Sequence, residues 1–122
     1  MAATERALEL TQAAAEAAVA KLASDPVAFD VSDQLAITDV FLVLTAQNER
    51  QVETVVDAIE ERLRELGERP TRREGQRENR WVLLDYLDIV VHVQHVEERV
   101  LYSLERIWGD CPQLPLALDE RR

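Results

Sequence analysis

The sequence predicts an α/β fold: a single domain over residues 1–122, with a mixed sheet of about five strands flanked by helices and a tail at residues 110–122. Two apolar runs at residues 82–84 and 89–93, separated by an acidic turn, are typical of strands covered on both faces. A helical stripe lies between strand-like runs, and a strand–helix–strand order is typical of α/β folds. A chain of 122 residues fits one domain, which is large enough to bury a core, but it is too short for two domains.

The first expected element is a helix from about residue 5 to residue 23. Thr4 precedes it as the N-cap, and the alanines that fill it are the best helix formers. Asp25-Pro26 ends it. Residues 27–31 alternate as a strand does, and residues 40–44 form a continuous apolar run that predicts a central strand. The apolar stripe of the helix is shallow and contains Leu8, Thr11, Ala15, Ala18, Val19 and Leu22.

The second helix begins after Asn48, because Asn48 and Gln51 resemble a capping box. Gly67 supplies the residue that follows its C-cap. Residues 68–80 are polar, and residues 70–73 fit a short edge strand. The five arginines of this interval raise an RNA-binding interpretation, but interleaved glutamates and the lack of an aromatic residue favour a solvated loop. The apolar stripe of the second helix contains Val52, Val55, Val56, Ile59, Leu63 and Leu66.

Both tryptophans, both tyrosines and both histidines lie within residues 81–108, so chemistry or recognition is expected there. Alternation along the strand at residues 89–93 places His92 on the face opposite Ile89, Val91 and Val93. An amphipathic helix follows, and Tyr102 falls almost opposite its apolar stripe. The stripe, which is expected to face the sheet, contains Val100, Leu101, Leu104, Ile107 and Trp108. Leucines then alternate in the tail, which is expected to pack along the domain: Leu114, Leu116 and Leu118.

Composition excludes several classes of protein. The net charge is −10, from 24 acidic and 14 basic residues, which argues against nucleic acid as the direct partner. On charge alone the acidity favours a role in solubility, and the alternative is a surface that attracts a basic protein partner. No apolar run approaches the ~20 residues of a membrane span, and no signal peptide is evident, so we expect a cytoplasmic protein. A single cysteine, Cys111, excludes an internal disulfide and a cysteine-based metal cluster.

Two acids, Asp85 and Asp88, are closely paired within the apolar region. One hypothesis is an enzyme, a Mg²⁺-dependent nucleotidyltransferase that uses both carboxylates. Their spacing of three residues across a turn, and the lack of any glycine-rich phosphate-binding motif, favour turn-forming aspartates instead. His92 is interpreted as a structural, hydrogen-bonded histidine, and no metal or cofactor site is expected.

Tyr102 leaves two interpretations open: an isolated surface residue, or an interface anchor of the kind enriched at binding hot spots. If Trp81 points to the same side, the two rings would form an aromatic patch. The acids that would rim this patch are Asp85, Asp88, Glu98 and Glu105.

Several ordered motifs resemble the ribosomal silencing factor family of Iojap-like proteins over nearly the whole chain. The motifs, in their order along the chain, are Asp30-Val31-Ser32, Thr38-Asp39 with the strand that follows, Arg50-Gln51-Val52, Glu74-Gly75, Trp81 to Tyr86, Asp88 to His92, and Tyr102 to Trp108. The resemblance implies a nucleotidyltransferase-like fold without transferase activity and without a cofactor. It also implies binding to large-subunit ribosomal protein fourteen, which blocks docking of the small subunit and represses translation when nutrients are limiting or growth is stationary.

The resemblance further implies a homodimer in some members and assigns candidate residues for the partner-binding surface or its support. By position these are Trp81, Asp85, Asp88, His92, Tyr102 and Glu105. The chain departs from the family at Leu87, where the family usually has glycine; because leucine resists a positive φ, a different local turn is expected. The family also tends to have a serine- and glycine-containing entry to the second helix, which Thr45-Ala46-Gln47-Asn48 replaces here.

Overall fold

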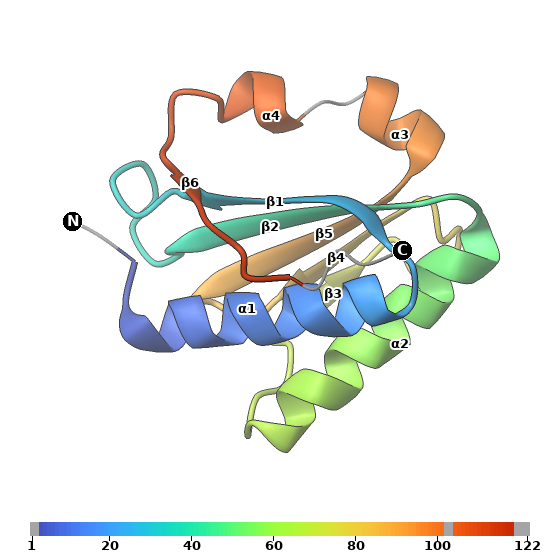
Figure 1. Cartoon of the computed structure of the whole chain (residues 1–122), viewed down its shortest axis with the longest axis horizontal. Coiled ribbons are helices and arrows are strands. Elements are labelled where there is room, and N and C mark those ends of the chain that lie inside the picture. The colour runs from blue at the N-terminus through green and yellow to red at the C-terminus, as the bar shows by residue number, and fades with distance from the viewer. Residues whose placement is uncertain (1–2, 102–103, 119–122) are drawn as a thin grey trace.

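The structure, a computed structural model, describes residues 3–101 and 104–118. The chain forms its helices and strands in an alternating order that ends with two short helices and a short strand (Figure 1). The elements are α1 (Glu5–Ala20), β1 (Ser24–Asp30), β2 (Val40–Ala46), α2 (Glu49–Glu65), β3 (Arg72–Glu74), β4 (Trp81–Asp85), β5 (Ile89–His95), α3 (Val96–Leu101), α4 (Leu104–Ile107) and β6 (Gln113–Leu114).

The strands form one mixed sheet in the order β3-β4-β5-β2-β1-β6. The β2–β5 pair is parallel, and the other pairs are antiparallel. The predicted mixed α/β sheet is therefore confirmed, with six strands within the described residues. The sixth strand, β6, is a two-residue segment of the tail that pairs with Phe29 and Ala28 of β1.

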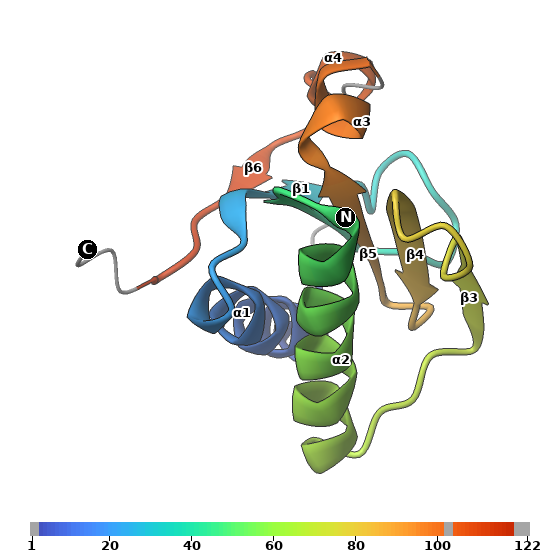
Figure 2. The ribbon, with the colours of Figure 1, turned by 90° about the vertical axis from the view of Figure 1, so that its right-hand side faces the viewer.

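Helices α1 and α2 cover one face of the sheet, and α3 and α4 lie on the other (Figures 1 and 2). The main core lies under α1 and α2 and joins side chains such as Leu10, Leu42, Ile59 and Leu84, all almost fully buried. The predicted caps are confirmed: Thr4 Oγ1 accepts from the backbone N–H of Ala7 at 3.1 Å, and Asn48 Oδ1 accepts from that of Gln51 at 2.8 Å. Each cap satisfies a backbone donor that the first helical turn leaves free.

The stripe predicted for α1 was wrong in part. Leu8 is 40% exposed and Leu22 is 79% exposed, whereas Leu10 and Ala14 are buried. The helix ends at Ala20, and Leu22 follows it with a φ of 71°, so it does not share the helical phase. The helix instead turns its smallest residues inward, which lets its backbone approach the sheet and α2 closely.

The stripe predicted for the last helix was also wrong in part. Leu104 is 6% exposed, but Val100 is 76% and Ile107 is 67% exposed. The prediction assumed one continuous helix, in which these three residues share a face. The structure describes two short helices, α3 and α4, and neither is long enough to present the continuous stripe of the predicted helix. The smaller core under them contains Phe29, Val31, Val43, Leu104 and Cys111.

The tail packs along the domain, as predicted. Leu114, Leu116 and Leu118 are partly buried against the main core. Gln12 of α1 holds the tail through two hydrogen bonds: its Nε2 donates to the carbonyl of Ala117 at 2.6 Å, and its Oε1 accepts from the N–H of Ala117 at 3.0 Å. Of the helices in the described part of the chain, none has the length and apolar character needed to cross a membrane.

Candidate docking face

The sheet face opposite α1 and α2 is only partly covered. Along β4 the burial alternates, because Val82 and Leu84 point into the main core while Trp81, Leu83 and Asp85 point the other way and stay partly exposed. Phe41 of β2 and Trp108, just after α4, are also partly exposed on this side. We define the open face as Phe41, Trp81, Leu83, Asp85, His92 and Trp108.

The rings of the open face contact one another in a chain. The ring of Phe41 meets that of Trp108 edge-on, with 5.1 Å between centroids, and meets that of His92 in the same way at 5.1 Å. Trp81 Nε1 donates a hydrogen bond to His92 Nδ1 at 3.2 Å. Edge-to-face contacts of this kind add to the burial energy and fix the ring orientations. The chain of contacts therefore links β4, β5 and β2 to the end of α4.

His92 lies at the centre of this cluster and is 5% exposed. Its Nδ1 accepts the Trp81 hydrogen bond, so the ring proton of the neutral form lies on Nε2. Burial lowers the pKa of His92 to about 4, so the ring is neutral near pH 7. The interpretation of His92 as a structural, hydrogen-bonded residue is confirmed, and its place on the face opposite Ile89, Val91 and Val93 is confirmed as well.

The turn between β4 and β5 presents the two predicted acids. Asp85 Oδ1 accepts from the N–H of Leu87 at 2.8 Å, and its Oδ2 lies 3.7 Å from Arg72 Nη2. The carbonyl of Asp88 accepts from the N–H of Asp39 at 2.8 Å, which ties the turn to the strand entry, while its side chain is exposed. Asp85 thus acts as a turn-forming aspartate. Within the described residues, no cluster of three or more histidine, cysteine or acidic side chains is placed to hold a metal ion.

Leu87 adopts a φ of 71° at this turn and is 45% exposed. Leucine was expected to resist a positive φ here, but the backbone takes the left-handed conformation that glycine favours. The hydrogen bond from Leu87 to Asp85 and the β4–β5 pairing on either side hold it there. The conformation costs a non-glycine residue on the order of 1 kcal/mol.

An ion-pair cluster forms the other end of β4, where the strand begins. Arg80 donates to Glu97 at 2.7 Å, to Glu98 at 3.2 Å and to Glu49 at 3.1 Å. The Arg80 guanidinium holds the pKa of the Glu97 carboxyl below its usual value. The cluster joins the start of α2 and α3 to the residue that precedes Trp81, and so fixes the position of that ring.

A close backbone approach at Gly75 also positions Trp81. Gly75 has a φ of 86°, and a Cβ atom there would lie 2.0 Å from the carbonyl oxygen of Trp81. Only glycine fits this approach without a backbone shift.

The structure thus brings together four of the six predicted site residues in one region. Trp81, Asp85 and His92 belong to the open face, and Asp88 lies at the adjoining turn. Tyr102 lies outside the described residues, and so does the side chain of Glu105. Sequence reasoning missed Phe41 and Leu83 as members of this face, because both stand in apolar runs that show no alternation. It placed Trp108 in a stripe that faces the sheet, and the contact with Phe41 agrees with that.

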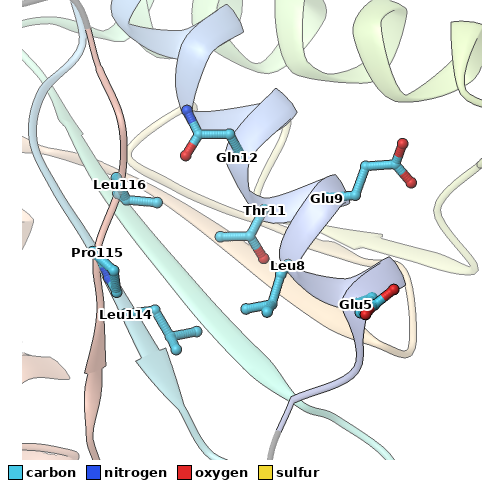
Figure 3. A pocket seen from close by; sticks show the side chains of 8 residues that line it. All are labelled: Glu5, Leu8, Glu9, Thr11, Gln12, Leu114, Pro115 and Leu116. Carbon is cyan, nitrogen blue, oxygen red and sulfur yellow. The ribbon is translucent and has the colours of Figure 1, made fainter.

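A separate hollow of about 450 Å³ lies on the other side of the domain, between α1 and the tail (Figure 3). Leu8, Leu114 and Leu116 form its apolar part, with Glu5 and Glu9 of α1 among its polar residues. It is remote from the open face, because the sheet lies between them (Figure 1).

A family model described as "Ribosomal silencing factor during starvation" matches residues 4–122 of the chain. The chain belongs to the ribosomal silencing factor family. A protein of Halalkalibacterium halodurans named "Ribosomal silencing factor RsfS" is 39% identical over 108 residues, which cover 88% of this chain and 92% of that protein. The protein of the same name from Bacillus subtilis is 39% identical over 99 residues, 81% of this chain and 84% of that one. The chloroplastic protein Iojap of Zea mays is 33% identical over 88 residues, which are 70% of this chain but 37% of that protein.

Solved structures support the same assignment at the level of the fold. A crystal structure of a protein from Chromobacterium violaceum superimposes with a TM-score of 0.81 and 28% sequence identity, covering 92% of each chain. One from Bacillus halodurans gives a TM-score of 0.79 and 36% identity, covering 89% of this chain and 99% of that one. The family resemblance read from the motifs is confirmed, and the fold is that of the family.

Proposed function

We propose that this chain represses translation by binding the large ribosomal subunit in the cytoplasm and blocking the docking of the small subunit when nutrients are limiting. The partner on the large subunit is large-subunit ribosomal protein fourteen. Membership in the silencing factor family supports the role. We choose the open face as the binding surface because aromatic and aliphatic side chains remain partly exposed there, whereas α1 and α2 cover the other face of the sheet.

The chemistry of this face fits a basic partner with an apolar contact area. The net charge of −10 attracts and orients a basic protein, and Asp85 and Asp88 place carboxylates at one margin. Partly exposed Trp81 is of the residue type that dominates binding energies, and we include Tyr102 and Glu105 in the same surface. His92 is buried, so its role is to hold the Trp81 ring rather than to contact the partner. The mechanism is steric, with no cofactor and no turnover.

The experiment is co-sedimentation of the purified protein with large subunits, followed by addition of small subunits. The wild-type chain is expected to sediment with large subunits and to reduce the yield of full ribosomes. Leu83→Arg places a positive charge in the open face and is expected to weaken binding by about 2 kcal/mol, roughly thirtyfold. Leu8→Arg is the matched control, because Leu8 is a partly exposed leucine of α1 on the other side of the sheet, and it is expected to bind normally.

Tyr102→Ala tests the residue assigned from the family resemblance. It is expected to fold, as judged by circular dichroism, and to lose about 2 kcal/mol of binding free energy or more. Normal binding by folded Leu83→Arg would remove the open face from the proposal, and normal binding by Tyr102→Ala would remove that residue alone. A wild-type chain that stays in the supernatant would contradict the proposed function itself.

A second copy of the chain is the competing occupant of the open face. Light scattering across a dilution series measures whether the protein is a homodimer, and Leu83→Arg would dissociate a dimer formed through this face. If Leu83→Arg alters self-association but not co-sedimentation, the face serves dimerisation.

The rival enzyme, a Mg²⁺-dependent nucleotidyltransferase, would need Asp85 and Asp88 to share a cation. Both Asp85 oxygens already have partners, Leu87 N–H and Arg72, which supports the non-enzymatic proposal. Thermal unfolding with Mg²⁺ and a nucleoside triphosphate tests this: stabilisation by both together that Asp88→Asn removes would support the enzyme.

A further inference from the structure

A cavity lined by charged side chains lies where α2 ends and the connection to β3 begins. Figure 2 shows this end of α2 and the connection. The volume of the cavity is about 190 Å³. Three arginines, two glutamates and a proline line it: Glu60, Arg64, Glu68, Arg69, Pro70 and Arg73.

The ion pairs of these residues leave an excess of positive charge. Arg73 donates to Glu60, and Arg6 of α1 pairs with Glu68 at 3.0 Å, so both cavity glutamates are neutralised. Among the described residues, the side chains of Arg64 and Arg69 have neither an ion pair nor a hydrogen bond. Two uncommitted guanidinium groups therefore line one small cavity in a protein whose net charge is −10.

A buried hydroxyl lies close to the same charges. Tyr86 is 4% exposed, and its hydroxyl has no hydrogen-bond partner among the described residues. The charges that act on it are those of Glu60, Arg73 and Glu68, which all line the cavity. A buried hydroxyl without a partner is costly, and Tyr86 lies within reach of the electrostatic effect of the cavity side chains although it does not line the cavity.

The carboxyl end of α2 would ordinarily oppose an anion, because its free carbonyls carry partial negative charge. Here the carbonyls of Leu63, Arg64 and Leu66 are occupied. The carbonyl of Leu63 accepts from the N–H groups of Leu66 and Glu68, and that of Arg64 accepts from Gly67 N–H at 2.9 Å. The carbonyl of Leu66 accepts from Arg6 Nη2 at 2.5 Å.

We propose that this cavity binds the phosphate group of a small phosphorylated molecule between Arg64 and Arg69. Guanidinium groups match phosphate oxygens with paired N–H donors, and two cations balance a phosphate dianion. The overall negative charge repels a polyanion such as RNA more strongly than one small dianion. The site is independent of the proposed ribosomal function and of the open face.

The test is titration of the full chain with inorganic phosphate in the millimolar range at constant ionic strength, with chloride as the reference. Binding is followed by NMR through the backbone amides of residues 64–73 and by the midpoint of thermal unfolding. Saturable shifts are expected for the wild type, and Arg64→Gln or Arg69→Gln is expected to weaken phosphate binding about tenfold each. Arg62→Gln is the matched control, because Arg62 is an exposed arginine of α2 that pairs with Glu65 and does not line the cavity.

Three results would overturn the proposal. One is the absence of saturation with phosphate in the wild type. Another is an equal loss of affinity in Arg62→Gln, which would indicate a general charge effect. The third comes from a single-stranded oligouridylate: if it binds with dependence on Arg64 and Arg69 while inorganic phosphate does not bind, the cavity is an RNA contact and not a small-molecule site.

Discussion

Lowering the pH should destabilise the fold through His92. The buried ring has a pKa of about 4 in the folded protein against a usual value of 6.5. As the pH falls below 6.5, the unfolded chain takes up a proton on this histidine before the folded chain does. The stability from the neutral ring is therefore complete above pH 6.5 and is lost as the pH falls toward 4. At pH 4.5 and below the loss is on the order of 2–3 kcal/mol.

The assay is urea unfolding at pH 7.0, 5.5 and 4.5, followed by circular dichroism, for the wild type and His92→Gln. Glutamine retains an acceptor oxygen for Trp81 Nε1 but does not titrate. The carboxylates are the same in both proteins, so their contribution cancels when the pH dependence of one is subtracted from that of the other. Between pH 7.0 and 4.5, the free energy of unfolding of the wild type should fall by roughly 2–3 kcal/mol more than that of the variant.

Parallel pH dependences in the two proteins would refute this reasoning. They would mean that His92 has the same pKa in the folded and unfolded states, and so that the centre of the open face is accessible to water.

Two further substitutions test local features of the β4–β5 turn. Tyr86→Phe removes a buried hydroxyl that has no partner among the described residues. In phosphate-free buffer, urea titrations should therefore show a rise of roughly 1 kcal/mol in the free energy of unfolding. A clear loss of stability would show that the hydroxyl is satisfied. Leu87→Ile puts a β-branched residue at a φ of 71° without changing side-chain volume, and it should lower the free energy of unfolding by about 1 kcal/mol or more. The control, Leu83→Ile in the extended strand β4, should lower it much less. Equal costs would mean that the turn relaxes around residue 87.

Features of this fold that depend on local sequence were predictable. The caps at Thr4 and Asn48 and the stripe of α2 follow from contacts within one helix. The face of His92 follows from the period of a strand, and the role of Asp85 follows from a turn of four residues. In each case the deciding interactions join residues that are close in the sequence.

Features that depend on contacts between distant segments were not predictable in this way. The inward face of α1 depends on how closely its alanines allow the helix to approach α2 and the sheet. The sequence pattern that includes Leu8 does not indicate this face, and Leu8 is in fact partly exposed. The exposure of Val100 and Ile107 shows that the short helices α3 and α4 do not present the continuous buried stripe that a long helix would. The ring chain from Trp81 through His92 to Phe41 requires the strand order β4-β5-β2, which no single motif specifies.

The two faces of the sheet differ in how completely they are covered by other elements. The main core under α1 and α2 buries most of the apolar side chains, so the stability of the domain does not require the other face to be fully covered. On that other face, the buried ring of His92 holds Trp81 by a hydrogen bond and Phe41 by an edge contact, and Phe41 in turn holds Trp108. Rings held in this way lose little freedom when a partner covers them, which lowers the entropic cost of binding. A buried, neutral histidine at the centre thus orders the aromatic rings of the open face.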